Sequence, residues 1–455
     1  MIIRNFRTAE PKASVPADIA NVDSIIEPIP LWGYYVPNTE YFNIMPSGNS
    51  HIDRSKINST PLGYIFPDNP FKSIWDDFYH HINMIEIKID DSKSRHERLK
   101  GNRKHLAHSL SNIEKSDICS YINKAYPNLF PVNNSDSLPY SSSNPEQIIG
   151  FKDEYGLHLV QLSTLTEIKQ EIYSLKLDIF SRNTGILESD VMLGKRALFI
   201  GCGSVGSLVA VELAKAGVGS FILVDMDVFG YHNICRHQCG IYDVGRFKTD
   251  AVADRILQIN PYAEIKKYNC AIQDVDVDVL KDFCTEDAII IGGADNREGD
   301  HYACQFAMHG GSAFISIGCW ERAFAGEIFY CLPGMPDYSD FLDAIGYESG
   351  RVTQNRRFYT NEEELEKVSF EPGISADINF VTIIAVKIAL DLLNRNNEKF
   401  TQRIIPHITQ YTLVCNTNEE SIGGEHAEIF SYPLQVTTSI TVPYSQKKNS
   451  MIAWQ

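Results

Sequence analysis

The feature that most constrains the fold of this chain is a glycine-rich run directly after a short apolar segment. Residues 197–200 have the character of a strand, and Gly201, Gly203 and Gly206 follow them at the start of a helical stretch, residues 205–216. Glycines at a strand-to-helix turn let the backbone approach a ligand closely, and the N-terminus of the helix attracts negative charge. The run therefore predicts a nucleotide site, although three glycines alone do not identify the nucleotide.

Short strand-like and longer helical segments alternate along this part of the chain. The strand-like runs lie at 197–200, 221–224, 265–268, 288–291 and 313–317, and the helical stretches between them include 205–216, 248–258 and 297–309. This alternation is typical of a doubly wound parallel sheet. We therefore predict an α/β fold built on a Rossmann-like, doubly wound and mainly parallel sheet, with an extra N-terminal accessory domain.

The 455 residues, 44% of them hydrophobic, can form buried cores in about two to three domains. Asn, Ser and Pro are frequent within residues 131–150, which predicts a linker. We expect an N-terminal accessory or partner-docking domain at 1–130, the nucleotide-binding domain at 151–400 and a β-rich extension at 401–455. Early in the nucleotide-binding domain, apolar residues at helical spacing predict a helix over 162–180.

The net charge of −17 argues against a nucleic-acid or anionic-membrane partner, because phosphate contacts require a clustered cationic surface. The N-terminus has no apolar segment long enough for a signal peptide, and the longest apolar stretch, 380–393, contains Lys387 and Asp391 and is too short to span a bilayer. Ten cysteines without a dense framework fit a reducing compartment. We expect a soluble, cytoplasmic protein with no nucleic-acid or membrane partner.

Polar and charged side chains follow the predicted strands where a nucleotide would need them. Asp225 lies 19 residues (225 − 206) after Gly206, the spacing at which a carboxylate accepts hydrogen bonds from ribose hydroxyls. Asn233, Arg236 and Lys248 come next. Reaction of ATP requires neutralisation of three phosphates and a departing pyrophosphate, whereas a nicotinamide cofactor needs fewer donors. The two cations therefore favour ATP over a nicotinamide dinucleotide.

A second acidic position follows the strand predicted at 288–291. Asp295 closes this segment, so its carboxylate is expected at the carboxyl edge of the sheet, where it would hold Mg²⁺. Asp227 is expected to offer a second oxygen donor in the same region, and Asn296 a further contact to the nucleotide. We therefore expect ATP and Mg²⁺ as cofactors.

Several of these residues fall into motifs, which are Gly-Cys-Gly-Ser-Val-Gly at 201–206, Asp225-Met-Asp227, Asn233 with Arg236, Phe247-Lys248, Ile259-Asn-Pro261 and Ala294-Asp-Asn296. Through them, residues from about 180 to 393 resemble the ThiF/MoeB family of ubiquitin-activating-like adenylating enzymes. The resemblance implies that Asp225 holds the ribose, that Arg236 and Lys248 bind the phosphates and that Asp295 organises magnesium. It also implies a homodimer in which Arg182, just before the first strand, reaches into a neighbouring subunit's ATP site.

The activity implied by the resemblance is ATP-dependent adenylation of the C-terminal carboxylate of a small ubiquitin-like or sulfur-carrier protein. Arg182, Arg236, Lys248 and Asp295 would be its catalytic residues, acting by positioning and charge stabilisation. Later transfer to a thiol stays open, as does a conjugating-enzyme partner. The candidate thiols are Cys235, Cys239 and Cys319.

Zinc-binding members of the family carry two cysteines after the strand that corresponds here to 326–332. This chain has aspartates in that phrase, at Asp337 and Asp340, so we expect no structural zinc. Three alternative functions stay open: adenylation of a short peptide in peptide-nucleotide biosynthesis, a NAD-binding Rossmann oxidoreductase, and a pseudoenzyme scaffold.

Overall fold

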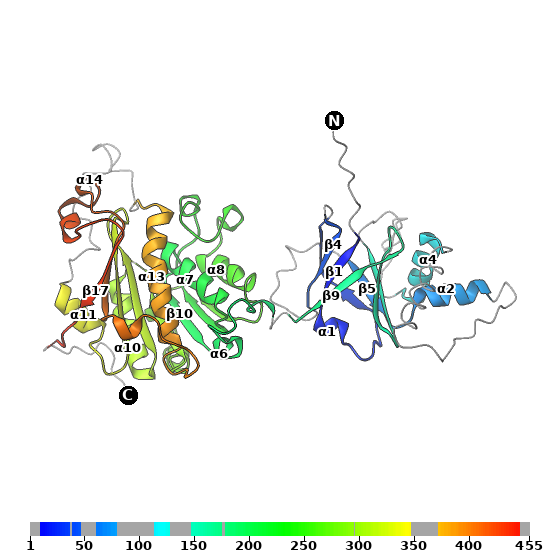
Figure 1. Cartoon of the computed structure of the whole chain (residues 1–455), viewed down its shortest axis with the longest axis horizontal. Helices are drawn as coiled ribbons and strands as arrows, with labels where there is room; N and C mark the ends of the chain where they lie inside the picture. Colours follow the sequence, from blue (N-terminus) through cyan, green and yellow to red (C-terminus); the bar gives the residue numbers. More distant parts are fainter. Residues whose placement is uncertain are drawn as a thin grey trace. The chain divides into compact units, whose positions relative to one another are not determined.

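The computed structural model describes residues 10–36, 39–46, 61–79, 113–127, 147–174, 178–294, 296–346 and 372–445. The chain forms two compact units, Met1–Asp178 (unit 1) and Ile179–Gln455 (unit 2), each with its own sheets and core (Figure 1). Among the described helices, none combines the length and the apolar character that crossing a bilayer requires.

Unit 2 is built on one eight-stranded sheet. In spatial order its strands are β12 (Glu264–Tyr268), β11 (Ser220–Val224), β10 (Arg196–Ile200), β13 (Ala288–Gly292), β14 (Ala313–Cys319), β15 (Ala325–Cys331), β16 (Tyr411–Cys415) and β17 (Gln435–Ile440). The strands from β12 to β14 are parallel, and β15, β16 and β17 add antiparallel. The prediction of a doubly wound, mainly parallel sheet is confirmed.

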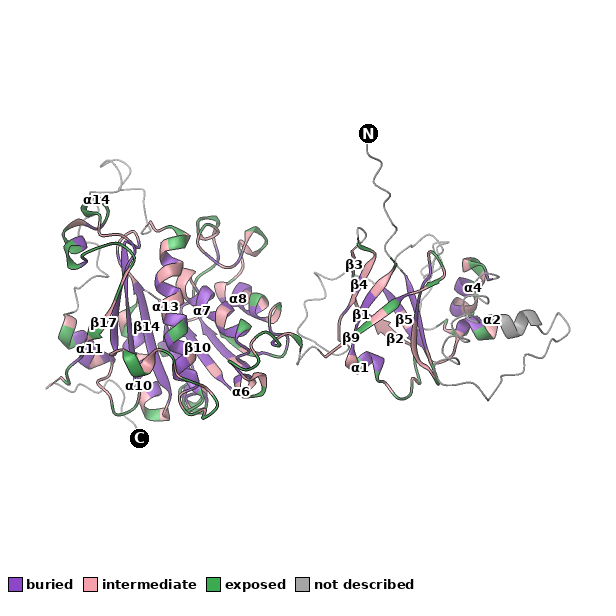
Figure 2. Ribbon diagram, in the orientation of Figure 1, coloured by how far each residue is buried: buried purple, intermediate pink, exposed green. Residues whose placement is uncertain are grey.

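Helices cover both faces of this sheet because the parallel strands carry apolar residues on both sides. On one face, Phe199 and Leu223 pack with α7 (Ser204–Lys215), α8 (Lys248–Leu257) and α13 (Ser375–Leu393). On the other, Leu198 and Ile222 pack with α9 (Val277–Phe283), α10 (Arg297–Gly310) and α11 (Tyr338–Ile345). Figure 2 shows the strands as the buried centre of the unit. Alternate residues of β10 and β11 therefore belong to opposite cores.

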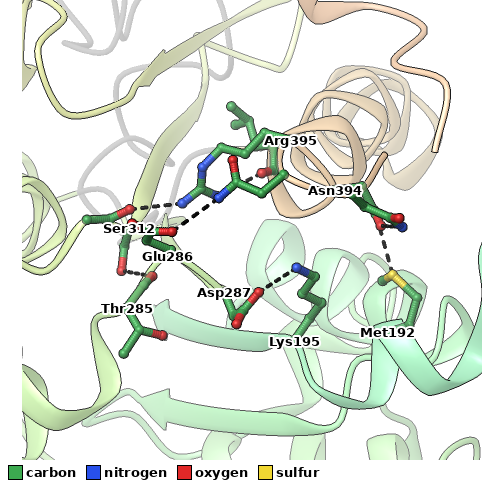
Figure 3. A network of polar contacts seen from close by, with 12 residues as sticks. Met192, Lys195, Thr285, Glu286, Asp287, Ser312, Asn394 and Arg395 are labelled. Carbon is green, nitrogen blue, oxygen red and sulfur yellow. Dashed lines mark hydrogen bonds and ion pairs between the residues drawn. The ribbon is translucent and has the colours of Figure 1, made fainter. Parts of the chain in front are cut away.

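A polar network secures the end of the sheet at which β10 and β13 begin (Figure 3). Lys195 Nζ donates to Asp287 Oδ1 at 2.6 Å, and these residues immediately precede the two strands. Arg395, just after α13, donates to the carbonyl oxygen of Gly311 at 2.9 Å. Ser312 Oγ, just before β14, donates to the carbonyl oxygen of Thr285 at 2.8 Å. These hydrogen bonds connect the segments at the amino edge of the sheet.

Unit 1 contains two sheets. The first has the strand order β3 (Gly33–Val36), β4 (Tyr41–Ile44), β1 (Lys12–Pro16) and β9 (Lys169–Tyr173). The second has the order β2 (Ile29–Leu31), β5 (Gly63–Phe66), β6 (Ile148–Asp153), β7 (Gly156–Gln161) and β8 (Thr166–Glu167). The helices of unit 1 are α1 (Ala17–Ala20), α2 (Pro70–Tyr79) and α4 (Lys115–Ala125). Buried residues of α2, α4, β6 and β7 share one core.

Three expectations about the chain's organisation are corrected. The extra N-terminal domain is present, but it extends to Asp178, because β6 pairs with β5 and β9 pairs with β1. Most of the expected linker at 131–150 lies outside the described residues, and its end begins β6 within unit 1. The expected extension at 401–455 is not separate, because β16 and β17 complete the sheet of unit 2.

The helix predicted over 162–180 is also wrong. Thr166–Glu167 form β8 and Lys169–Tyr173 form β9 instead, and Lys169 on β9 lies opposite Lys12 on β1. Ile168 is 2% exposed and Ile172 is 61% exposed, so they do not form the shared apolar face of a helix.

Candidate active site

The glycine-rich turn connects β10 to α7 at the carboxyl edge of the sheet. From β10 the chain proceeds to β11 on one side and later reaches β13 on the other, so this turn lies at a topological switch point. Gly201 has a φ of +93°, and a Cβ there would lie 2.8 Å from the Ala294 nitrogen. A Cβ on Gly206 would lie 2.0 Å from the carbonyl oxygen of Gly201. Both positions therefore require glycine.

Gly203 has a different role from the other two glycines. It is the N-cap residue of α7, and among the described residues no atom lies within 4 Å of the place where its Cβ would be. The missing side chain leaves open space in front of the N-terminus of a 12-residue helix. Backbone N–H groups and the helix dipole favour an anion there, so the turn fits a phosphate group.

Asp225 follows β11 directly and contacts the glycine-rich turn. Its Oδ2 accepts a hydrogen bond from the Cys202 nitrogen at 2.7 Å, and its Oδ1 accepts one from the Asp227 nitrogen at 2.8 Å. Two backbone donors thus fix the orientation of the carboxylate. Each oxygen keeps a second lone pair, so the half-buried carboxylate is able to accept from ribose hydroxyls as well.

Lys248 and Asp227 form an ion pair that the sequence did not predict. Lys248 opens α8, and its Nζ lies 2.6 Å from Asp227 Oδ2, with side-chain exposures of 11% and 62%. The Lys248 nitrogen also donates to the carbonyl oxygen of Asp227 at 3.0 Å. The carboxylate expected to lie near magnesium is therefore held against the lysine expected to bind phosphate.

Asn233 is the last residue of η2 (Tyr231–Asn233), and Arg236 lies in the tight turn that follows it. Asn233 Oδ1 accepts from the Gly230 nitrogen at 2.8 Å, and the carbonyl oxygen of Asn233 accepts from the Arg236 nitrogen at 3.1 Å. His237, which is not among the site residues predicted from the sequence, is buried beside the glycine-rich turn. No sequence signal other than its place next to Arg236 points to it.

The second acidic position is only partly covered by the structure. Asp295 lies outside the described residues. Asn296 is exposed and caps α10, because its Oδ1 accepts from the Glu298 and Gly299 nitrogens at 3.1 and 3.2 Å. Among the described residues, no three His, Cys, Asp or Glu side chains are grouped so that they could hold a metal ion. The magnesium assignment to Asp295 stays a prediction.

Arg182 lies apart from the other candidate residues of unit 2. It is exposed, and the neighbouring Asn183 donates through Nδ2 to the carbonyl oxygen of Lys215 at 2.9 Å. Lys215 is the last residue of α7, whereas the glycine-rich turn precedes its first residue. The 12 residues of α7, at a rise of roughly 1.5 Å each, separate the two places by about 18 Å.

The candidate thiols differ in exposure. Burial raises the pKa of Cys239 to about 12, which opposes the thiolate that a nucleophile requires. Cys319 is half-buried at the end of β14, and Cys235 is exposed with its Sγ 3.6 Å from the carbonyl oxygen of His232. Cys235 is therefore the most accessible of the three.

The two aspartates in the segment after β15 have a structural role. Asp337 Oδ1 accepts from the Ser339 and Asp340 nitrogens at 2.9 and 3.1 Å, and Asp340 Oδ2 accepts from the Asp337 nitrogen at 2.9 Å. These bonds form a capping box at the start of α11.

Comparison with known proteins places this site in a family. The model of the ThiF family matches residues 179–418, which is more than half of the chain. The chain is 28% identical over 137 residues to the probable adenylyltransferase/sulfurtransferase MoeZ of Mycobacterium tuberculosis, a match over 30% of this chain and 34% of that protein. It is 29% identical over 147 residues to the ATP-dependent ubiquitin transferase-like protein Cap2 of Pseudomonas aeruginosa, a match over 29% of this chain and 27% of that protein.

The chain thus spans about a third of the length of the curated relatives it matches. Among solved structures, the crystal structure of E. coli MccB with ATP superposes with a TM-score of 0.41 and 15% identity, covering 75% of this chain and 83% of that one. The family match includes the glycine-rich turn, Asp225, the Asn233–His237 turn and Lys248. The chain belongs to the ThiF family.

Proposed function

We propose that unit 2 uses ATP to adenylate the C-terminal carboxylate of a small carrier protein. One observation carries the proposal: the glycine-rich turn, open at Gly203, binds Asp225 through the Cys202 nitrogen, and the segments that follow β11 bring Lys248 and the turn that carries Arg236 to the same edge. This arrangement offers a ribose acceptor, a phosphate cradle and two cations. A nucleoside triphosphate needs all three.

In the proposed reaction, a carboxylate oxygen of the carrier attacks the α-phosphorus of ATP. The bond from that phosphorus to the bridging oxygen breaks, pyrophosphate departs with the electron pair, and an acyl-adenylate remains. The N-terminus of α7 binds the phosphates, and Lys248 shifts from Asp227 toward the transferring group. Arg236 supplies the second positive charge. Asp295 is the residue that would hold magnesium, which would neutralise charge on the departing pyrophosphate.

We propose a ubiquitin-like or sulfur-carrier protein as the substrate, because two relatives bear the names adenylyltransferase/sulfurtransferase and ubiquitin transferase-like protein. A short peptide is the alternative, and both present a terminal carboxylate. Transfer to a thiol and a conjugating-enzyme partner would follow adenylation. Ten free cysteines support a reducing, cytoplasmic location.

We further propose a homodimer in which Arg182 serves the partner's site. The position of Arg182 beside the C-terminal end of α7 supports this, because an arginine side chain is far shorter than the helix that separates it from its own glycine-rich turn. A two-fold arrangement would give each site one cation from the other copy.

Exchange of labelled pyrophosphate into ATP tests the proposed function. Exchange should require Mg²⁺ and a carrier with a free C-terminal carboxylate, and a carrier amidated at its C-terminus should not support it. Asp295→Ala should remove the exchange. If no carboxylate-bearing carrier or peptide supports exchange although the protein is folded, the proposed function is wrong.

Two lysine variants in the same exchange assay test whether the activity depends on the candidate site. Lys248→Ala should lower turnover about a hundred- to a thousandfold, the effect of losing one contact that stabilises transition-state charge. Lys267→Ala is the matched control, because Lys267 also forms an ion pair with an aspartate, its Nζ lying 2.5 Å from Asp250 Oδ1. Unlike Lys248, Lys267 lies on β12, the edge strand of the sheet. Exchange at the wild-type rate in Lys248→Ala would refute the role of this lysine.

A further inference from the structure

The buried residue that follows Arg236 connects two parts of the proposed site. His237 is 8% exposed, and its Nε2 lies 2.7 Å from the carbonyl oxygen of Cys202 in the glycine-rich turn. Its Nδ1 lies 3.0 Å from the Cys239 nitrogen, and its ring packs edge-on against Phe229. Both ring nitrogens are therefore used by the backbone, and neither is directed at a ligand.

The partners of His237 determine its protonation. The Cys239 N–H is a donor, so Nδ1 must accept and carries no proton. The carbonyl oxygen of Cys202 is an acceptor, so Nε2 must carry the proton and donate it. Burial lowers the pKa of His237 to about 4 although the hydrogen bond to Cys202 raises it, with the charge of Lys248 acting in the same direction as burial and that of Asp243 against it. The ring is thus neutral near pH 7 and keeps this donor.

His237 and Arg236 belong to one backbone turn. The carbonyl oxygen of Asn233 accepts from the nitrogens of both residues, at 3.1 Å for Arg236 and 3.0 Å for His237. The next nitrogen along the chain, that of Gln238, donates to Ser207 Oγ on α7 at 3.4 Å. A shift of His237 would therefore shift the backbone that carries Arg236.

Cys202 is the point at which these contacts meet. Its nitrogen holds Asp225, the proposed ribose acceptor, and its carbonyl oxygen holds His237. One peptide segment of the glycine-rich turn thereby sets the place of the ribose carboxylate and of the turn that bears the guanidinium.

We propose that His237 is a positioning residue. The hydrogen bond from its Nε2–H to the Cys202 carbonyl oxygen holds Arg236 where it contacts the phosphates of ATP. The inference rests on the proposed function, because it takes Arg236 as a phosphate ligand. It predicts that loss of this bond weakens binding of the triphosphate more than binding of AMP, which lacks the outer phosphates.

Two conservative substitutions distinguish the hydrogen bond that Nε2 donates to Cys202 from the one that Nδ1 accepts from Cys239. The amide nitrogen of His237→Gln is able to take the place of Nε2 and donate to Cys202. In His237→Asn the shorter amide is able to replace only Nδ1 as the acceptor for Cys239. By calorimetry with MgATP and with AMP, His237→Asn should bind MgATP about tenfold more weakly, the loss of one hydrogen bond of ordinary net strength. Its affinity for AMP should equal that of the wild type, and His237→Gln should bind both ligands normally.

An Arg236→Ala background gives the second part of the test. If His237 acts through Arg236, His237→Asn should cause no further loss of MgATP affinity in that background. Normal MgATP binding by His237→Asn, an equal loss for MgATP and AMP, or an additive loss in the double variant would overturn the inference. Absence of MgATP binding by the wild-type protein would instead overturn the proposed function, and the inference with it.

Discussion

Mixing two inactive variants tests whether Arg182 serves a neighbouring copy of the chain. Asn183 donates a hydrogen bond to the last residue of α7. About 18 Å of helix therefore separates the neighbouring Arg182 from its own glycine-rich turn. Arg182→Ala and Lys248→Ala should each be nearly inactive in pyrophosphate exchange. A mixed dimer of the two has one site with the partner's intact Arg182 and its own intact Lys248, and one site that lacks both.

The recovered activity follows from counting sites. Random exchange of subunits at equal concentrations puts half of the dimers in the mixed form, and one of two sites in each is complete, so about a quarter of the wild-type activity should return. The assay is the exchange rate as a function of mixing ratio, with subunit exchange followed by a fluorescent label on each variant. If labels exchange completely and no activity returns, Arg182 acts within its own chain or has no catalytic role.

Three further predictions concern other parts of the chain. Gly206→Ala should lower the thermal midpoint, because its Cβ would lie 2.0 Å from the carbonyl oxygen of Gly201, and overpacking of this kind costs about 1–3 kcal/mol; an unchanged midpoint would contradict this packing. Asp225→Ala should raise KM for ATP more than it lowers kcat, since a ribose contact is equal in ground and transition states; steady-state kinetics with the opposite pattern would refute the ribose role. In unit 1, Glu167 raises the pKa of His158, so this pair stabilises the fold below about pH 6.5 and loses its effect as the pH rises through the folded-state pKa. The difference in unfolding midpoint between wild type and His158→Asn should therefore be larger at about pH 5 than at about pH 9, and a pH-independent difference would refute it.

The sheet of unit 2 could be predicted because its signals are local. Residues 288–291 are a continuous apolar run, the pattern of a parallel strand buried on both faces, and they form most of β13. The apolar spacing of residues 162–180 does not by itself distinguish a helix from strands, and Ile168 and Ile172, four residues apart, are 2% and 61% exposed in the strands and turn that form. Only the pairing of β9 with β1, far away in sequence, decides between the two.

The features of the site also divide into those that local sequence signals predict and those that depend on tertiary contacts. Gly201 and Gly206 could be predicted as obligate glycines because their motif reports backbone geometry, and the structure shows the close approaches that require them. The Lys248–Asp227 ion pair and the contact of His237 with the glycine-rich turn depend on how the segment after β11 folds back. No spacing of residues in the sequence determines that path, so the sequence does not predict these contacts.

In the proposed reaction, a carboxylate oxygen of the substrate attacks the α-phosphorus of ATP. A carrier protein or peptide labelled with ¹⁸O in its C-terminal carboxylate tests it directly, when the adenylate is cleaved at its acyl carbon by an added amine or thiol and the AMP is analysed by mass spectrometry. We expect AMP that carries one ¹⁸O atom, because the bridging oxygen comes from the carboxylate and stays with phosphorus. Formation of ADP, or of AMP without ¹⁸O, would contradict it.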